Sequence, residues 1–245
     1  MRPLAWLTLQ LLLLLLGVMS LGWNLLALPL LVLPAAHGRV LGRRVIAGAY
    51  AWYWRVAARS GLLQMDASVL RPLAAERGLV VVANHPSLLD ALMLVAQLPR
   101  AACVMKAELL RNPFLGAGAR LAHYIDNRSA HGMVSQAVAE LRLGGQLVLF
   151  PEGTRTTEHP VNAFGAAAGL IAKHARAPVQ AVFIETDSPY LGKGWPLWRL
   201  PPLPIVFTVR LGRRFDPPCN PQAFRTELQA YFAAALQACP RPTRR

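Results

Sequence analysis

The chain has 245 residues, with 26 Lys and Arg against 12 Asp and Glu, which gives a formal net charge of +14. Hydrophobic residues make up 54% of the chain and charged residues 16%. The apolar content excludes a disordered chain, because disorder needs low hydrophobicity. The charge excludes the acidic surface of an ordinary cytosolic enzyme. A membrane or a polyanion is therefore the expected partner.

The apolar residues are concentrated at the N-terminus. No charged residue occurs between Pro3 and Ala36, a run longer than the roughly 20 residues that one upright membrane helix needs. The run predicts a membrane anchor over residues 1–38, either one tilted span followed by an interfacial stretch or a helical hairpin that dips into one leaflet. A secretory signal is the competing interpretation, although its apolar core is typically only about 7–15 residues long.

A basic and aromatic stretch follows the apolar run. Only Arg2 precedes the run, whereas five arginines lie between it and the first acidic residue, Asp66: Arg39, Arg43, Arg44, Arg55 and Arg59. The positive-inside rule then places the body of the protein in the cytoplasm, at the inner membrane if the source is bacterial. The aromatic cluster Tyr50, Trp52, Tyr53 and Trp54 fits two alternatives. It belongs either to a linker helix over 39–70 at the headgroup level or to the start of the globular core.

From about Gly78 onward, short apolar runs alternate with helical patterns. The sequence predicts strands at 78–83, 102–105, 123–125, 146–150, 179–184 and 204–211, and helices at 87–97, 133–143, 163–174 and 221–238. This alternation indicates an α/β fold, with a largely parallel mixed sheet flanked by helices and preceded by the membrane-associated helical segment. The three cysteines, Cys103, Cys219 and Cys239, form no CxxC pair and lie near no pair of histidines. Neither a disulfide framework nor a metal site is therefore expected.

Polar residues follow the first of these strands, at the edge where open parallel sheets place their sites. The chain there reads Asn84-His85-Pro86-Ser87-Leu88-Leu89-Asp90, with Ser87 as the expected N-cap of the next helix. Pro86 disfavours the α region for the residue before it, which would leave His85 in the turn and Asp90 in the first helical turn. Asp90 would then hold one imidazole nitrogen while the other takes a proton from a hydroxyl. A capping carboxylate beside a surface histidine is the alternative.

A second polar segment ends the strand at 146–150. It reads Phe150-Pro151-Glu152-Gly153-Thr154-Arg155 and brings a carboxylate, a bare backbone and a guanidinium to one edge of the sheet. Gly153 permits a close approach of the backbone, and Arg155 can bind a phosphate with two hydrogen bonds. A routine turn with an exposed ion pair is the alternative.

Together the two segments resemble the glycerolipid acyltransferases, whose best-known members are the 1-acylglycerol-3-phosphate acyltransferases. Residues 84–90 are similar to motif I of that family and residues 150–155 to motif III. Three further segments resemble runs that the family usually carries around these motifs: 106–116, 124–128 (motif II) and 178–179 (motif IV). The likeness covers roughly residues 75–215.

The resemblance implies acyl transfer from a thioester, on coenzyme A or acyl carrier protein, to the hydroxyl of a lysophospholipid, foremost 1-acylglycerol 3-phosphate. It implies no bound cofactor or metal. His85 would be the catalytic base and Asp90 its partner, and the acceptor would be bound by Arg128, Glu152, Gly153, Thr154 and Arg155. The acyltransferase domain would occupy residues 71–245. Its partners would be membrane lipids and the acyl donor, with no nucleic acid.

Three positions depart from the family pattern. Asn127 is inserted before Arg128, the segment 162–165 lacks the lysine that usually follows motif III, and Ala181 replaces the second proline of motif IV. The missing cation keeps open an acceptor without a phosphate, such as a lyso-amino-acid lipid. A lipid or thioester hydrolase, in which His85 activates water, is the remaining alternative.

Overall fold

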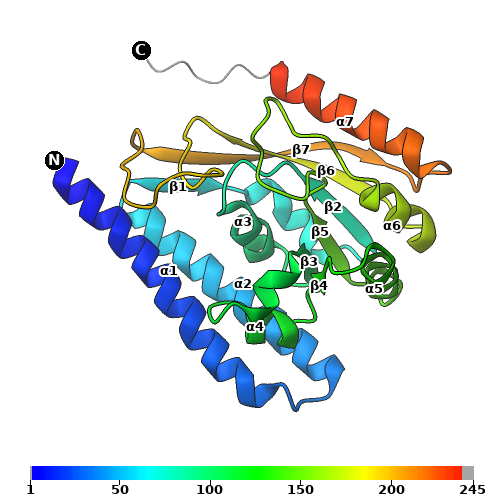
Figure 1. Cartoon of the computed structure of the whole chain (residues 1–245), viewed down its shortest axis with the longest axis horizontal. Coiled ribbons are helices and arrows are strands. Elements are labelled where there is room, and N and C mark those ends of the chain that lie inside the picture. The colour runs from blue at the N-terminus through cyan, green and yellow to red at the C-terminus, as the bar shows by residue number, and fades with distance from the viewer. Residues whose placement is uncertain (1, 239–245) are drawn as a thin grey trace.

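A seven-stranded sheet forms the centre of the computed structural model, which describes residues 2–238 and so leaves Cys239 outside (Figure 1). The strand order is β1-β7-β6-β2-β5-β3-β4. All neighbouring strands are parallel except β6 and β7. The strands are β1 (Leu63–Asp66), β2 (Leu79–Ala83), β3 (Ala101–Met105), β4 (Ile125–Asp126), β5 (Gln146–Leu149), β6 (Val179–Thr186) and β7 (Ile205–Phe215). The predicted α/β class with a largely parallel mixed sheet is confirmed.

Helices cover both faces of the sheet. One face packs against α1 (Arg2–Leu30), α2 (Ala35–Arg59), α3 (Asp90–Gln97) and the 3-10 helix η1 (Ser68–Ala75), and the other against α5 (Ala130–Arg142), α6 (Ala167–Ala175) and α7 (Pro221–Gln237). The 3-10 helix η2 (Ala107–Arg111) and α4 (Gly116–Leu121) complete the chain between β3 and β4. Because β2 is covered on both faces, all five of its residues are buried, as expected for a central parallel strand.

Two helices begin later than the sequence predicts. The predicted helix at 87–97 begins at Asp90, since the Ser87 hydroxyl bonds to the Tyr190 carbonyl (3.0 Å) rather than capping a helix. The predicted helix at 163–174 begins at Ala167, because side chains distant in sequence bind the N–H groups that precede it. Phe164 N, for example, donates to the Gln229 side chain (2.9 Å).

The polar residue Asn24 binds α1 to the domain. Its Oδ1 accepts hydrogen bonds from the N–H groups of Ala117 (2.6 Å) and Gly118 (3.0 Å), and its Nδ2 donates to Pro113 O (2.6 Å). These N–H groups lie in the first turn of α4, where they have no partner within the helix, so Asn24 caps α4 from another helix. Most residues of α1 are apolar and only four residues of the helix are buried, and by length and composition the helix could cross a membrane.

The basic stretch after α1, predicted as one interfacial linker helix over 39–70, is not a single helix. Its helix, α2, ends at Arg59, and residues 63–66 form β1, which pairs with β7. Arg43 does not face lipid headgroups, because it is buried and its Nη1 and Nη2 bind the two oxygens of Glu140 on α5 (2.6 and 3.0 Å). Tyr53 and Trp54 are likewise buried in the core, while Trp52 is exposed. The two buried aromatic side chains therefore belong to the core rather than to a membrane surface.

Candidate active site

Both predicted polar segments meet at the carboxyl edge of the parallel strands. The first follows β2 and the second follows β5, and these two strands are direct neighbours. Asn84 fixes the start of the first segment, since its side chain donates to Ile184 O (2.9 Å) and accepts from Ile184 N (2.8 Å). The buried amide of Asn84 thus extends the pairing of β2 with β6 by one residue and sets where the turn to His85 begins.

His85 and Asp90 form a hydrogen-bonded dyad. His85 Nδ1 lies 2.8 Å from Asp90 Oδ2, which also accepts from Ser87 N (2.7 Å). The His85 side chain is 17% exposed and stacks on Phe150, with ring centroids 4.1 Å apart. Since Nδ1 is engaged by Asp90, Nε2 is the ring nitrogen left to exchange a proton with a bound hydroxyl.

Asp90 is a carboxyl group in an unfavourable environment for charge. It is fully buried, and its Oδ1 has no hydrogen-bond partner within the described residues. Burial raises the pKa of Asp90 to about 6, against the lowering effect of the hydrogen bond and charge of His85. The His85 imidazole is therefore the main group that offsets the cost of a buried negative charge on Asp90. When Nε2 takes up a proton, the imidazolium that forms is stabilised by Asp90.

Glu152 holds the two segments together. Its Oε1 accepts from His85 N (3.0 Å) and from the Thr156 hydroxyl (2.8 Å), and its Oε2 accepts from Asn162 N (2.9 Å). Thr156 N returns a hydrogen bond to His85 O (2.7 Å). The carboxylate is buried and fully engaged with these groups, so in this structure Glu152 positions His85.

Arg155 is also engaged inside the protein. Its Nη1 donates to Leu191 O (2.9 Å) and to Gly192 O (3.0 Å), in the connection between β6 and β7. Gly153 lies nearby with a positive φ of +66° and open space where a side chain would be, and Thr154 is half-buried next to it. These three residues share the sheet edge with His85, as predicted.

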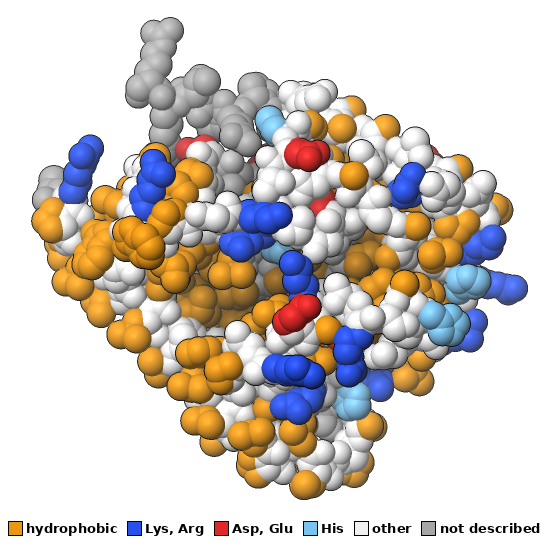
Figure 2. All heavy atoms as spheres, in the orientation of Figure 1, with side chains coloured by type: hydrophobic (Ala, Val, Ile, Leu, Met, Phe, Trp, Pro, Cys, Tyr) orange, Lys and Arg blue, Asp and Glu red, His pale blue; other side chains and the backbone are white. Residues whose placement is uncertain are grey.

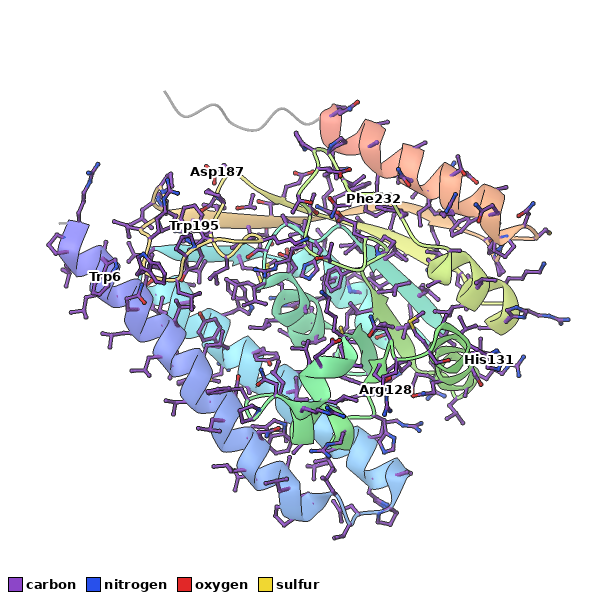
Figure 3. The ribbon with its side chains drawn as sticks, viewed as in Figure 1. Trp6, Arg128, His131, Asp187, Trp195 and Phe232 are labelled. Carbon is purple, nitrogen blue, oxygen red and sulfur yellow. The ribbon has the colours of Figure 1, made fainter. Side chains whose placement is uncertain are left out.

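Arg128 lies apart from the dyad. It follows β4 at the far edge of the sheet, is 72% exposed, and forms a two-point ion pair with Asp126 (2.9 and 2.8 Å). It lines a cavity of about 640 Å³ with Arg111, Arg120 and His123. Figure 3 shows Arg128 well away from Trp195.

Two other cavities lie closer to the dyad. One, of about 820 Å³, is lined by Asn84 and Pro86 on either side of His85, and by Thr156 and Trp195. The other, of about 130 Å³, is almost wholly apolar and lies among α1, α2, α3, α4 and β3, with Ala91, the residue after Asp90, in its wall. Within residues 2–238, no group of three His, Cys, Asp or Glu side chains is placed to hold a metal ion.

The chain was compared with protein-family models, curated protein sequences and solved structures. Residues 65–185, which include both polar segments, match the family model described as Acyltransferase. These residues form a domain of the Acyltransferase family. The crystal structure of the 1-acyl-sn-glycerophosphate acyltransferase PlsC from Thermotoga maritima resembles this acyltransferase with a TM-score of 0.67 over 97% of each chain, at 20% identity. None of the curated protein sequences matches the chain significantly.

Sequence reasoning about the acyltransferase site missed what the surrounding residues do. It assigned no role to Asn84, which bonds to the Ile184 backbone and sets where the turn to His85 begins, or to Phe150, whose ring stacks on His85. It also expected Glu152 and Arg155 to face a ligand, whereas both bond to the protein's own backbone. The available signal was position alone, because Asn84 immediately follows one predicted strand and Phe150 is the last residue of the other.

Proposed function

We propose that this acyltransferase transfers an acyl chain from a soluble thioester, acyl-coenzyme A or acyl carrier protein, to a lysophospholipid hydroxyl, foremost that of 1-acylglycerol 3-phosphate. The observation that carries the proposal is the dyad, with His85 Nδ1 bound to buried Asp90 and Nε2 left for proton transfer. Membership of the acyltransferase family supports the reaction type. The structurally similar enzyme from Thermotoga maritima is a 1-acyl-sn-glycerophosphate acyltransferase, which favours that acceptor.

The reaction then needs one base and no covalent enzyme intermediate. His85 Nε2 takes the proton of the acceptor hydroxyl while the hydroxyl oxygen attacks the thioester carbonyl carbon. The C–S bond breaks as the tetrahedral species collapses, and the leaving thiolate takes the proton from the imidazolium. Asp90 keeps Nδ1–H oriented throughout and offsets the charge of the imidazolium.

The apolar cavity supports a substrate with a hydrocarbon chain. Its wall includes Ala91 and Leu92 of α3, Trp23 of α1 and Tyr50 of α2. An acyl chain that moves from water into this cavity buries its apolar surface against apolar side chains. Such burial stabilises binding. Ala91, the residue after Asp90, lies in the wall of this cavity, so we place the carboxyl end of a bound chain toward the dyad.

The enzyme attaches to a membrane through α1, with the catalytic domain on the cytoplasmic side. Support comes from the apolar exposed face of α1, and from its contacts with the domain along its length. Trp6 and Gln10 bond to the backbone at 197–198, and Asn24 bonds to α4. A helix of 29 residues is about 44 Å long. Because both of its ends touch the domain, α1 is better suited to lie in one leaflet than to cross the bilayer away from the domain.

Assays with labelled acyl thioester, with and without lysolipid acceptors, test the proposed reaction. His85→Ala should lower acceptor-dependent transfer by at least about 10²-fold, whereas His131→Ala, at an exposed position on α5, should retain it. The acceptor panel contains lysophosphatidate, other lysophospholipids and a lyso-amino-acid lipid. Transfer by His85→Ala at the wild-type rate would refute the mechanism. Thioester loss that needs no acceptor would instead support a hydrolase.

A further inference from the structure

The connection between β6 and β7, residues 187–204, reaches from the active site to α1. Its outer part lies beside the N-terminal half of α1, where Trp6 Nε1 donates to Trp198 O (2.8 Å) and Gln10 Nε2 donates to Leu197 O (3.0 Å). Figure 3 shows Trp6 and Trp195 at this same end of the molecule, close to the N-terminus. The position of the outer part relative to α1 is therefore set by direct hydrogen bonds.

The inner part of the connection is fastened to the catalytic turn. Arg155 Nη1 binds the carbonyls of Leu191 and Gly192, and the Ser87 hydroxyl binds the carbonyl of Tyr190 (3.0 Å). Tyr190 and Leu191 are each only 2% exposed. One short segment therefore bonds on its inner side to the turn that carries His85 and on its outer side to α1.

The outer part exposes large apolar side chains. Trp198 is 74% exposed and Leu197 is 54% exposed. They adjoin a row of exposed apolar residues on α1, which Figure 2 shows as a mostly orange edge of the molecule: Leu4, Trp6, Leu7, Leu11, Leu14 and Val18. Lys193 and Arg199 flank Leu197 and Trp198 and are exposed as well. Contiguous exposed apolar surface of this extent is typical of a binding surface.

We propose that Leu197 and Trp198 insert into the interface of an anionic lipid bilayer, as a second membrane contact beside α1. Indole rings favour the interface between headgroups and acyl chains, and Lys193 and Arg199 are placed where they would meet anionic headgroups. A bilayer fits better than a protein partner, because this patch adjoins the exposed apolar residues of α1, the helix proposed above to contact lipid. The proposal rests on the membrane attachment of α1 proposed above.

The contact would fix the depth of the active site relative to the lipid. The chain from Trp198 back to Leu191 is short, and Leu191 O also accepts a hydrogen bond from Leu88 N (3.0 Å). Leu88 lies in the turn between His85 and Asp90 and is 50% exposed. With Trp198 at the interface, the turn that carries His85 is held beside the membrane, where an acceptor embedded in the bilayer presents its hydroxyl.

Spin labels on single cysteines test both membrane contacts separately. The full chain carries Cys219→Ser and Cys239→Ser, and Cys103 is left in place because it is buried. Labels are attached in turn to Trp198→Cys, Leu197→Cys, Leu14→Cys on α1 and Leu143→Cys after α5, which are 74%, 54%, 61% and 68% exposed in the native protein. The protein is reconstituted in vesicles of phosphatidylglycerol and phosphatidylcholine, and collision rates with oxygen and with a water-soluble nickel chelate are measured.

We expect high oxygen and low nickel accessibility at positions 198, 197 and 14, and high nickel accessibility at position 143. A lipid signature at position 14 together with a water signature at 197 and 198 would overturn this inference while leaving the attachment of α1 intact. Labels at 197 and 198 that are shielded from both reagents would also overturn it, because they would indicate a protein contact. A water signature at position 14 would refute the membrane attachment itself.

Discussion

Replacing Asp90 by Asn separates the catalytic role of this carboxylate from its effect on stability. Asp90 Oδ2 accepts from His85 Nδ1 and from Ser87 N. In Asp90→Asn, an amide oxygen at the place of Oδ2 can keep the bonds from Ser87 N and from Nδ1, and the N–H₂ group takes the place of Oδ1, which has no partner among the described residues. The neutral amide no longer offsets the positive charge that forms on the imidazole when Nε2 takes the proton. We expect kcat to fall on the order of 10³-fold, within the range for a lost general base.

The same substitution should stabilise the fold at neutral and alkaline pH. Burial raises the pKa of Asp90 from 3.8 to about 6, and a difference of about two pKa units corresponds to about 3 kcal/mol. Because the folded state binds the proton more tightly than the unfolded state, this contribution is favourable below about pH 4 and is lost as the pH rises to about 6. Above pH 6, wild-type protein bears the full desolvation penalty that Asn avoids.

Thermal unfolding of detergent-solubilised wild type and Asp90→Asn at pH 4 and pH 8 measures the difference. The Tm gain from Asn should be larger at pH 8 than at pH 4, by about 2–4 °C for each kcal/mol. Asp216→Asn, which removes an exposed carboxylate, should show no such dependence on pH. An equal Tm difference at both pH values would refute the desolvation argument. A kcat within tenfold of wild type would refute the role of the Asp90 charge in stabilising the imidazolium.

Three further substitutions test a buried hydrogen-bonded carboxylate, a buried ion pair and the packing between two helices. Glu152→Gln places an amide N–H₂ group against an N–H donor and should cost about 1–3 kcal/mol, measured as a lower Tm together with a lower kcat. Arg43→Met leaves buried Glu140 with the longer ion pair to Arg39 (3.7 Å) and should cost about 3–5 kcal/mol. The added change Glu140→Leu should restore part of this loss in the same unfolding assay. Gly42→Ala places a Cβ 2.7 Å from the backbone of α4 and should lower Tm, whereas Gly48→Ala, with nothing within 4 Å, should not. Equal effects of the two alanine substitutions would contradict the close packing of α2 on α4.

Periodicity predicted the sheet well where strands are buried on both faces. β2 reads as an unbroken apolar run and was predicted within one residue of its bounds. β1 was not predicted, because the alternation in Leu-Gln-Met-Asp lasts only four residues, and its pairing with β7 makes it a strand. Local pattern therefore identifies central strands, and edge strands that depend on a distant partner escape it.

The sequence alone could not show which arginines lie at the membrane surface and which are buried in ion pairs. Arg43 was counted among the arginines expected at the membrane, yet it pairs with Glu140, 97 residues away. Nothing local to either residue indicates this pairing. A buried charge needs a partner of opposite sign, and that partner is set by how α2 and α5 pack on the finished sheet. The dyad could be predicted because its two residues are close in the sequence: His85 and Asp90 lie five residues apart, and Pro86 fixes the turn between them.

The internal bonds of Glu152 and Arg155 determine how their loss should act on the reaction. A charged group that already binds several protein donors or acceptors has fewer sites left for a ligand. Glu152 receives three hydrogen bonds and supports the backbone of His85, and Arg155 holds the connection that reaches α1. Substitutions at Glu152 should therefore lower kcat by displacing His85 more than they raise KM for the acceptor. If KM rose at unchanged kcat, the carboxylate would have to meet the acceptor directly, and its three bonds to the protein would have to open during turnover.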